Sequence, residues 1–297
     1  MLHRACWIWL DPQHFRNNHW VRFRRRFRIS GTCQGHLHIT ANSRYRLFIN
    51  GRILGQGPPR AWPQHYLFDQ YDLGPYLVQG ANVLAVLVHY WGIGNMQWLP
   101  AMPGLLAALE LKFPHTHEIL VTDEHWRVAE ENAYLYPTQR INVQMGFEEQ
   151  FDARRSSPDW SLPLFDDHDW APAAVIHEHD IDKARIHPHE LPHLTARERL
   201  PQRWLHAEGI RPCQHLWSMD LRPYFNPQDR SAHFMHTYGY LYTRVFAPEA
   251  TEAEFCRFHV QESRLKLNGD EIPAQASEGY FVHNFKHLLP LRQGWNH

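Results

Sequence analysis

The stretch RYRLFINGRILGQG, residues 44–57, places Asn50-Gly51 between two runs rich in apolar residues. Both residues of this dipeptide tolerate positive φ, which the two central residues of a type I′ turn require. Asn-Gly in this setting is the strongest short signal for a β-hairpin. The sequence therefore predicts two antiparallel strands that join at residues 50 and 51.

The segments around this hairpin have the same character. Residues 80–82, Gly-Ala-Asn, form a predicted corner that leads into a buried strand from Val83 to Val88. Further short strands follow, separated by turn signals, and no segment has the apolar period of an amphipathic helix. This pattern predicts a mostly β protein built from antiparallel sandwiches of the jelly-roll or galactose-binding type.

Residues 21–30, VRFRRRFRIS, alternate between apolar and basic side chains. Period two is typical of a strand with one buried face. Six arginines between Arg16 and Arg28 also raise the possibility of a nucleic-acid site. The regular alternation favours a solvated strand face instead.

An internal repeat indicates a second domain of the same type. A shift of 218 positions lays Asn50-Gly51 on Asn268-Gly269, and a Gly-x-Asn corner follows each pair, at residues 80–82 and 294–296. The second copy stops at His297 before the strand that follows the first corner, so we expect a C-terminally truncated piece of a longer protein. The predicted organisation is an N-terminal β-sandwich with strapping segments over residues 1–200, a linker over 201–235, and an incomplete second sandwich over 236–297.

The composition excludes several classes of protein. Of 297 residues, 43% are hydrophobic and 21% charged, which is a globular composition. The formal net charge of -1 supplies no field that would attract nucleic acid or an anionic membrane, so neither partner is expected. No apolar run reaches the ~20 residues of a membrane span, and the apolar run near the N-terminus is too short for a signal peptide. We therefore expect a cytoplasmic chain whose four widely spaced cysteines are reduced and mostly buried.

Residues 45–92, which include the hairpin, the segment Gly57-Pro58-x-Arg60 and the corner, resemble the N-terminal β-sandwich of bacterial α-L-rhamnosidases. The resemblance continues in ILVTDEHWRV (119–128), FEEQFDARRSSPDW (147–160) and FDDHDWAPA (165–173). The resemblance covers roughly residues 20–200, and a weaker resemblance begins at residue 240. Glu148 stands where the family usually has glycine, which weakens one of these motifs.

The resemblance implies a parent enzyme that removes terminal α-L-rhamnosyl groups with inversion and without a cofactor. In that family an (α/α)6 barrel, C-terminal to the sandwiches, supplies the catalytic acids. Nothing in this chain reads as successive helical hairpins, so the resemblance implies an accessory, non-catalytic region. Its partners would be rhamnose-containing glycans or glycosides and the catalytic domain of the same protein.

Three groups of carboxylates and three histidine pairs are the candidates for catalysis or metal binding. An inverting glycosidase needs two carboxyl groups ~6.5–9.5 Å apart. Turn-capping and ion-pair roles are favoured for the carboxylates, including a corner formed by Glu149, Asp152 and Arg154, and solvated loop positions for the histidines. No metal site is predicted. The carboxylate groups are Asp123-Glu124, Glu148-Glu149 with Asp152, and Asp166-Asp167 with Asp169; the histidine pairs are His115/His117, His177/His179 and His187/His189.

Two loops combine aromatic rings with side chains that read hydroxyl groups, the composition of a shallow sugar site. The competing interpretation is that these aromatic residues cover the open end of the sandwich or pack against a neighbouring domain. A lectin-like module and the accessory region of a β-galactosidase-like enzyme also remain open as functions. The candidate sugar-contact residues are Arg60, Trp62, Tyr66, Tyr90, Trp91, Asn95, Gln97 and Trp98.

Overall fold

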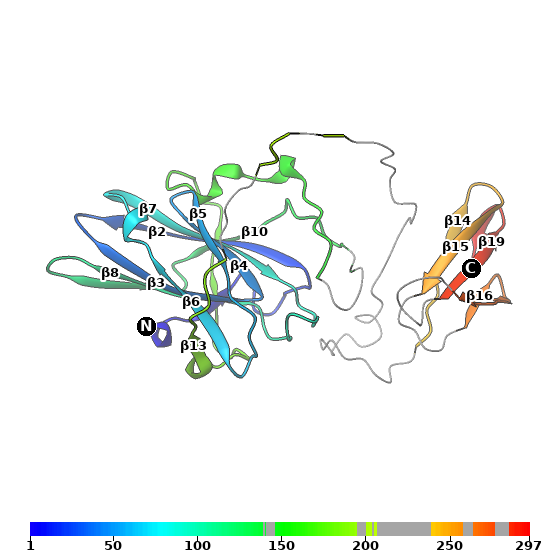
Figure 1. The fold of residues 1–297 in the computed structure, drawn as a ribbon, viewed down its shortest axis with the longest axis horizontal. Helices are drawn as coiled ribbons and strands as arrows, with labels where there is room; N and C mark the ends of the chain where they lie inside the picture. Colours follow the sequence, from blue (N-terminus) through cyan, green and yellow to red (C-terminus); the bar gives the residue numbers. More distant parts are fainter. Residues whose placement is uncertain are drawn as a thin grey trace. The chain divides into compact units, whose positions relative to one another are not determined.

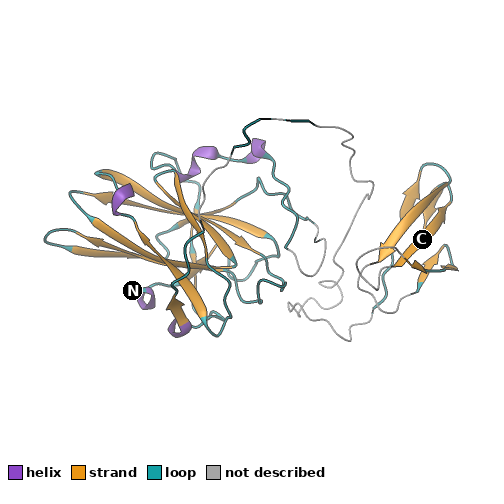
Figure 2. Ribbon diagram, in the orientation of Figure 1, coloured by secondary structure: helices purple, strands orange, loops and turns teal. Residues whose placement is uncertain are grey.

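A computed structural model describes residues 1–138, 140, 146–194, 200–203, 205–206, 239–257, 264–276 and 285–297. The chain divides into two compact units, Met1–His236 and Thr237–His297. Strands dominate the described residues of both units, and the helical segments in the same residues are 3-10 turns of three or four residues (Figure 2). The prediction of a mostly β protein is confirmed. Of the predicted linker, 201–235, only residues 201–203, 205 and 206 lie within the described residues.

The first unit contains a seven-stranded sheet in the order β12-β1-β8-β3-β6-β13, with β9 paired to β8. β13 runs parallel to β6, and the other pairs in this sheet are antiparallel. The purely antiparallel prediction did not include this parallel strand. The bounds are β1 Trp7–Trp9, β3 Gln34–Asn42, β6 Tyr66–Asp72, β8 Gly104–Lys112, β9 His117–Val121, β12 Ala174–Ile176 and β13 Ile186–Pro188.

A six-stranded antiparallel sheet in the order β11-β10-β2-β7-β4-β5 lies over the first sheet (Figure 1). Side chains such as Phe23, Leu47 and Val86 pack with Leu37 and Leu109 in the core cluster of the unit. The strand bounds are β2 His19–Ile29, β4 Arg44–Ile49, β5 Arg52–Gly57, β7 Gly80–Tyr90, β10 Arg127–Glu130 and β11 Ala171–Pro172. The 3-10 turns are η1 Leu2–Arg4, η2 Gly74–Tyr76, η3 Ala153–Arg155, η4 Pro158–Ser161 and η5 Lys183–Arg185.

The predicted hairpin joins β4 to β5, and its turn is tied to the predicted corner. Asn50 and Gly51 both have positive φ, 51° and 83°. The Asn50 Nδ2 donates to Asn82 Oδ1 at 2.8 Å, and Asn50 Oδ1 accepts from the Val83 N–H at 2.9 Å. Asn82 is fully buried and also accepts from the Val78 N–H at 2.9 Å. We call this arrangement the asparagine pin; it holds the turn against the start of β7.

The second unit repeats the asparagine pin. Asn268 Nδ2 donates to Asn296 Oδ1 at 2.9 Å, and Asn268 Oδ1 accepts from the His297 N–H at 3.0 Å. The repeat predicted from sequence is therefore a structural repeat. The strands of this unit are β14 Val245–Ala247, β15 Thr251–Arg257, β16 Leu265–Leu267, β17 Asp270–Ile272, β18 Gln275–Ala276, β19 Phe285–Leu291 and β20 Gly294–Asn296.

The prediction of a solvated arginine face on β2 is wrong for its first half. The side chains of Arg22 and Arg24 are 6% and 0% exposed. Arg22 pairs with Glu131, and Arg24 Nε pairs with Asp167 Oδ2 at 2.9 Å. An alternating basic pattern cannot show whether the arginine face of a strand is covered by solvent or by another layer of the protein. Water can hydrogen-bond to a guanidinium group, and so can buried carboxylates and carbonyls.

That covering layer is residues 157–170, which we call the strap. Besides Asp167, the Arg24 guanidinium donates to backbone carbonyls of Trp160, Leu162 and Phe165. The Trp160 ring packs with Leu87 and Trp20 in a small second cluster on the outer face of the sheet. β7 is therefore buried on both faces, as its continuous apolar sequence predicts.

Replacing Arg24 with methionine should lower the free energy of unfolding by about 3–5 kcal/mol, because Asp167 would keep its burial and lose its Arg24 partner. The exposed Arg28 on the same strand face provides the matched control, and Arg28→Met should change stability by less than about 0.5 kcal/mol. Urea unfolding followed by tryptophan fluorescence measures both. Equal midpoints for the two variants would contradict the structural role given to Arg24.

Replacing Asn82 with alanine should lower the free energy of unfolding by about 2 kcal/mol, because the part-buried Val78 N–H and the Asn50 side-chain amide would lose their partner. The exposed Asn132 provides the control, and Asn132→Ala should leave the unfolding midpoint unchanged. If Asn82→Ala unfolds at the same urea concentration as the wild type, the pin does not stabilise the corner.

Candidate functional site

The two candidate loops lie at the same end of the first unit. Residues 58–65 connect β5 to β6, and residues 91–103 connect β7 to β8. Tyr66 and Trp98, one from each loop region, both donate to Asn42 Oδ1 at the end of β3. The strand order thus brings together the two segments that the sequence singled out separately.

Five of the eight candidate residues have buried side chains, and this burial matches the packing interpretation for them. The Trp98 ring meets Tyr90 and Trp91 edge-on at centroid distances of 5.9 and 6.2 Å. The Tyr90 hydroxyl donates to the Ala101 carbonyl at 3.0 Å. Rings buried in this way offer no free face to a sugar. The five buried residues are Tyr66, Tyr90, Trp91, Asn95 and Trp98.

Arg60, Trp62 and Gln97 remain exposed and stay predicted contact residues. Trp62 is the most accessible ring of the group, at 64% exposure. Gln97 Oε1 accepts from Arg44 Nη2 at 3.0 Å, and the Arg44 guanidinium lies 5.1 Å from the centre of the Trp91 ring. Arg44 was not among the predicted residues; as an exposed basic position at the start of β4, it carries no local sequence signal.

A buried series of hydrogen bonds through Trp91, His89 and Asn18 holds the start of the 91–103 loop. The Trp91 Nε1 donates to His89 Nδ1 at 3.1 Å, and His89 Nε2 bonds to Asn18 Oδ1 at 2.8 Å. The His89 ring also stacks on Trp20, with centroids 3.7 Å apart. Because Trp91 donates to Nδ1, the neutral ring carries its proton on Nε2. Burial, with Arg44 and Arg46 nearby, holds the pKa of His89 well below its usual value.

The candidate aspartates act as turn caps and ion-pair partners, as the favoured interpretation predicted. Asp123, Asp152 and Asp166 each accept the backbone N–H of the residue two positions later. Asp152 also binds the Arg154 guanidinium at 2.8 Å, which confirms that part of the predicted corner. The third member of the corner, Glu149, lies instead near Tyr134, whose pKa its charge helps to raise.

The histidine pairs do not behave as solvated loop residues throughout, so that prediction is wrong for two of them. The His179 ring stacks on Trp7 with centroids 4.1 Å apart, and burial lowers its pKa to about 4. His189 Nε2 bonds to Asp69 Oδ1 at 3.0 Å, and its side chain is 7% exposed. These rings anchor the segment that carries β12 and β13. The described residues contain no cluster of His, Cys, Asp or Glu that could hold a metal ion.

The three described cysteines are free, and they are less buried than predicted. Cys6 and Cys33 are half-buried, and Cys256 is exposed. Among the residues that the structure describes, no helix is long and apolar enough to cross a membrane.

Comparison with known proteins gives one family and several relatives. Residues 32–196 match the family model described as the alpha-L-rhamnosidase N-terminal domain. An alpha-L-rhamnosidase of Streptomyces avermitilis is 28% identical over 162 residues, which are 50% of this chain and 15% of that protein. The crystal structure of a GH78 family rhamnosidase of Bacillus sp. GL1 matches with a TM-score of 0.77 and 27% identity, over 98% of this chain and 31% of that one. A lectin of Pleurotus ostreatus is more distant, with a TM-score of 0.41 and 21% identity over 59% of this chain and 42% of that one.

Stability should fall as the pH is lowered from about 6.5 towards 4. Burial lowers the pKa of His19 and of His179 to about 4, and it also holds the pKa of His89 well below its usual value. The unfolded chain therefore binds more protons than the folded chain throughout this window, and the histidine contribution is fully present only above pH 6.5. Urea midpoints at pH 7.5, 6.0 and 5.0 should decrease in that order. Constant midpoints from pH 7.5 to 5.0 would contradict the burial of neutral histidines.

Proposed function

The chain belongs, through residues 32–196, to the alpha-L-rhamnosidase N-terminal domain family, and we propose that it is the accessory, non-catalytic N-terminal part of an α-L-rhamnosidase-like glycoside hydrolase. The single observation that carries this proposal is the family match over residues 32–196, which hold most strands of the first sandwich. The chain spans 31% of the Bacillus rhamnosidase and 15% of the Streptomyces enzyme. The activity of the whole protein, removal of terminal α-L-rhamnosyl groups from glycans or glycosides, is part of the proposal.

The chemistry of the described carboxylates supports a non-catalytic role. Inversion needs one carboxylic acid and one carboxylate base on opposite sides of the sugar, with room for a water molecule between them. Asp167 is enclosed by Arg24 and Arg26, and Asp152 is held by Arg154 and by a backbone N–H. The Arg154 guanidinium and the backbone N–H lower the pKa of Asp152, which makes this carboxylate a poor general acid.

We assign the first unit a scaffolding role, in which its aromatic loops support a neighbouring catalytic domain of the same protein. The buried Trp91 and Trp98 hold the 91–103 loop to the sandwich, and the exposed Trp62 and Arg60 are left at the tip of the adjacent loop. An exposed tryptophan beside an arginine suits either a domain contact or a sugar contact. The family match favours this role over the accessory region of a β-galactosidase-like enzyme.

The exposure of Trp62 also supports a second candidate, a carbohydrate-binding module of lectin type. Titration with rhamnose-containing oligosaccharides, followed by tryptophan fluorescence, separates the two. A scaffold gives no saturable change. A binding module gives a saturable change that is lost in Trp62→Ala and kept in a variant of a buried ring, such as Trp160→Phe.

We expect that purified residues 1–297, shown by circular dichroism to be folded, release nitrophenol from p-nitrophenyl α-L-rhamnoside no faster than buffer alone. The reason is that Asp123 and Asp152 cap turns and that Asp167 forms a buried ion pair. The matched control is the double variant Glu148→Gln/Glu149→Gln, which should give the same background rate. Turnover that copurifies with the chain and falls in the double variant would contradict the non-catalytic assignment.

A further inference from the structure

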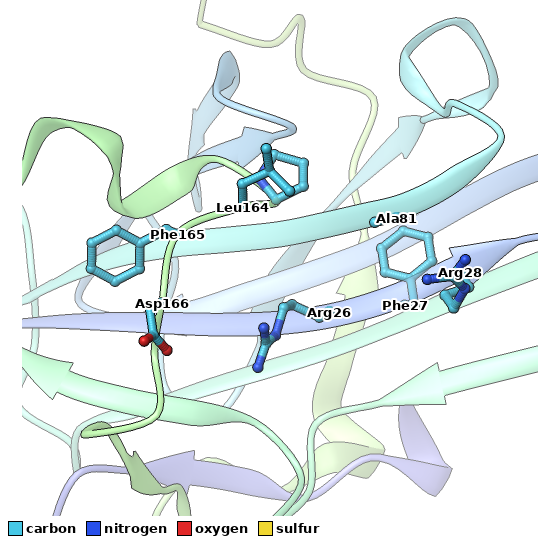
Figure 3. Close-up of a pocket in the computed structure, with 8 residues that line it drawn as sticks. Arg26, Phe27, Arg28, Ala81, Leu164, Phe165 and Asp166 are labelled. Atoms are coloured by element: carbon cyan, nitrogen blue, oxygen red, sulfur yellow. The ribbon is translucent and has the colours of Figure 1, made fainter.

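A pocket of about 480 Å³ opens in the first unit where the strap lies beside the end of β2, away from the two aromatic loops. Figure 3 shows its walls: the strand on one side, the strap on the other, and the Gly-x-Asn corner at one end. The lining residues are Arg26, Phe27 and Arg28 of β2, Ala81 of the corner, and residues 163–166 of the strap.

The charges around this pocket leave a positive excess at Arg28. Asp167 gives one oxygen to Arg24 and the other to Arg26, at 2.9 and 2.7 Å. Asp166 bonds to the His168 ring at 3.0 Å. In the part of the chain that the structure describes, the exposed Arg28 guanidinium makes no ion pair or hydrogen bond. The pocket lining thus holds two arginines and one carboxylate, and the unpaired Arg28 lies at the end of the pocket beside Ala81.

The room beside Arg28 comes from Ala81, which is its direct cross-strand partner. The second unit shows the contrasting arrangement: Trp295 occupies the matching corner position, and its ring packs on its cross-strand partner Phe246 with centroids 5.4 Å apart. In the first unit the small side chain leaves this space open. Leu164, which is 94% exposed, adds an apolar surface on the strap side.

We propose that this pocket binds the carboxylate of an acidic saccharide, with Arg28 as the charged contact. A guanidinium presents a planar fork of donors that matches a carboxylate, and its charge strengthens both hydrogen bonds. The apolar surface of Leu164 and Phe165 suits the C–H face of a pyranose ring next to that carboxylate. The ligand class is a hexuronate within a glycan. This proposal goes beyond the proposed function, which concerns the neutral rhamnosyl group, and it does not depend on that function.

The experiment is calorimetric titration of the full chain with glucuronate. Glucose, which has the ring without the charge, and acetate, which has the charge without the ring, are the comparison ligands. Glucuronate should bind saturably, and at least tenfold more tightly than either comparison ligand. Absence of saturable binding, or equal binding of acetate or glucose, overturns the proposal.

Variants locate the binding. Arg28→Gln should weaken glucuronate binding about tenfold, because it removes one charge-assisted contact. Ala81→Trp, which copies the corner of the second unit, and Leu164→Glu, which adds a negative charge, should each abolish it. The exposed Arg52 of β5 lies outside the pocket, so Arg52→Gln should bind as the wild type does. If Ala81→Trp does not fold, Arg28→Gln and Leu164→Glu decide the question, since both positions are exposed. Wild-type affinity in these two variants overturns the assignment of the site.

Discussion

The ion pair between Arg24 and Asp167 joins a central strand of the first unit to the strap, 143 positions later in the sequence. Both side chains are almost completely inaccessible, and the remaining guanidinium N–H groups are taken up by strap carbonyls. Burial lowers the pKa of Arg24 and the hydrogen bond to Asp167 opposes that shift; an arginine side chain stays protonated in proteins. Such a pair contributes less to net stability than apolar residues of the same volume would. Removing one partner lowers the free energy of unfolding strongly, because a buried charge is left unpaired. The pair therefore fixes the position of the strap on the sheet. The burial of β7 on both faces depends on that placement.

Local sequence signals were sufficient for the hairpin, the corner and the internal repeat. Asn50-Gly51 and Asn82 act within a short stretch of chain, where turn geometry and side-chain bonding are dictated by the residue types. The alternation of β2 predicted its strand equally well. It could not show what covers the basic face, because Glu131 and Asp167 lie more than 100 positions away. The same reason explains why the contacts of His179 and His189 were missed.

The candidate site shows the same division between local and distant information. Composition singled out the 58–65 and 91–103 loops, and Tyr66 and Trp98 from these loop regions both bond to Asn42. It could not distinguish an aromatic ring that covers the end of the sandwich from one that faces a ligand, since both need large rings beside polar groups. Burial separates them: Trp91 and Trp98 are buried in the fold, and the Trp62 ring is exposed. The pocket at Arg28 involves residues that the sequence marked only as a basic strand and a turn, and it forms because the strap lies beside β2.

Hydrogen exchange in the strap, read by mass spectrometry on the native chain, tests most directly the claim that the strap is an integral layer of the first unit. Its backbone N–H groups at Trp160, Leu162 and Trp170 each donate to the strap carbonyl three residues earlier and lie beside the buried arginine contacts. If the strap is fixed by Arg24 and Asp167, peptides covering 157–170 should exchange about as slowly as those covering β7. Exchange at the rate of unstructured chain, with β7 still protected, would contradict the account.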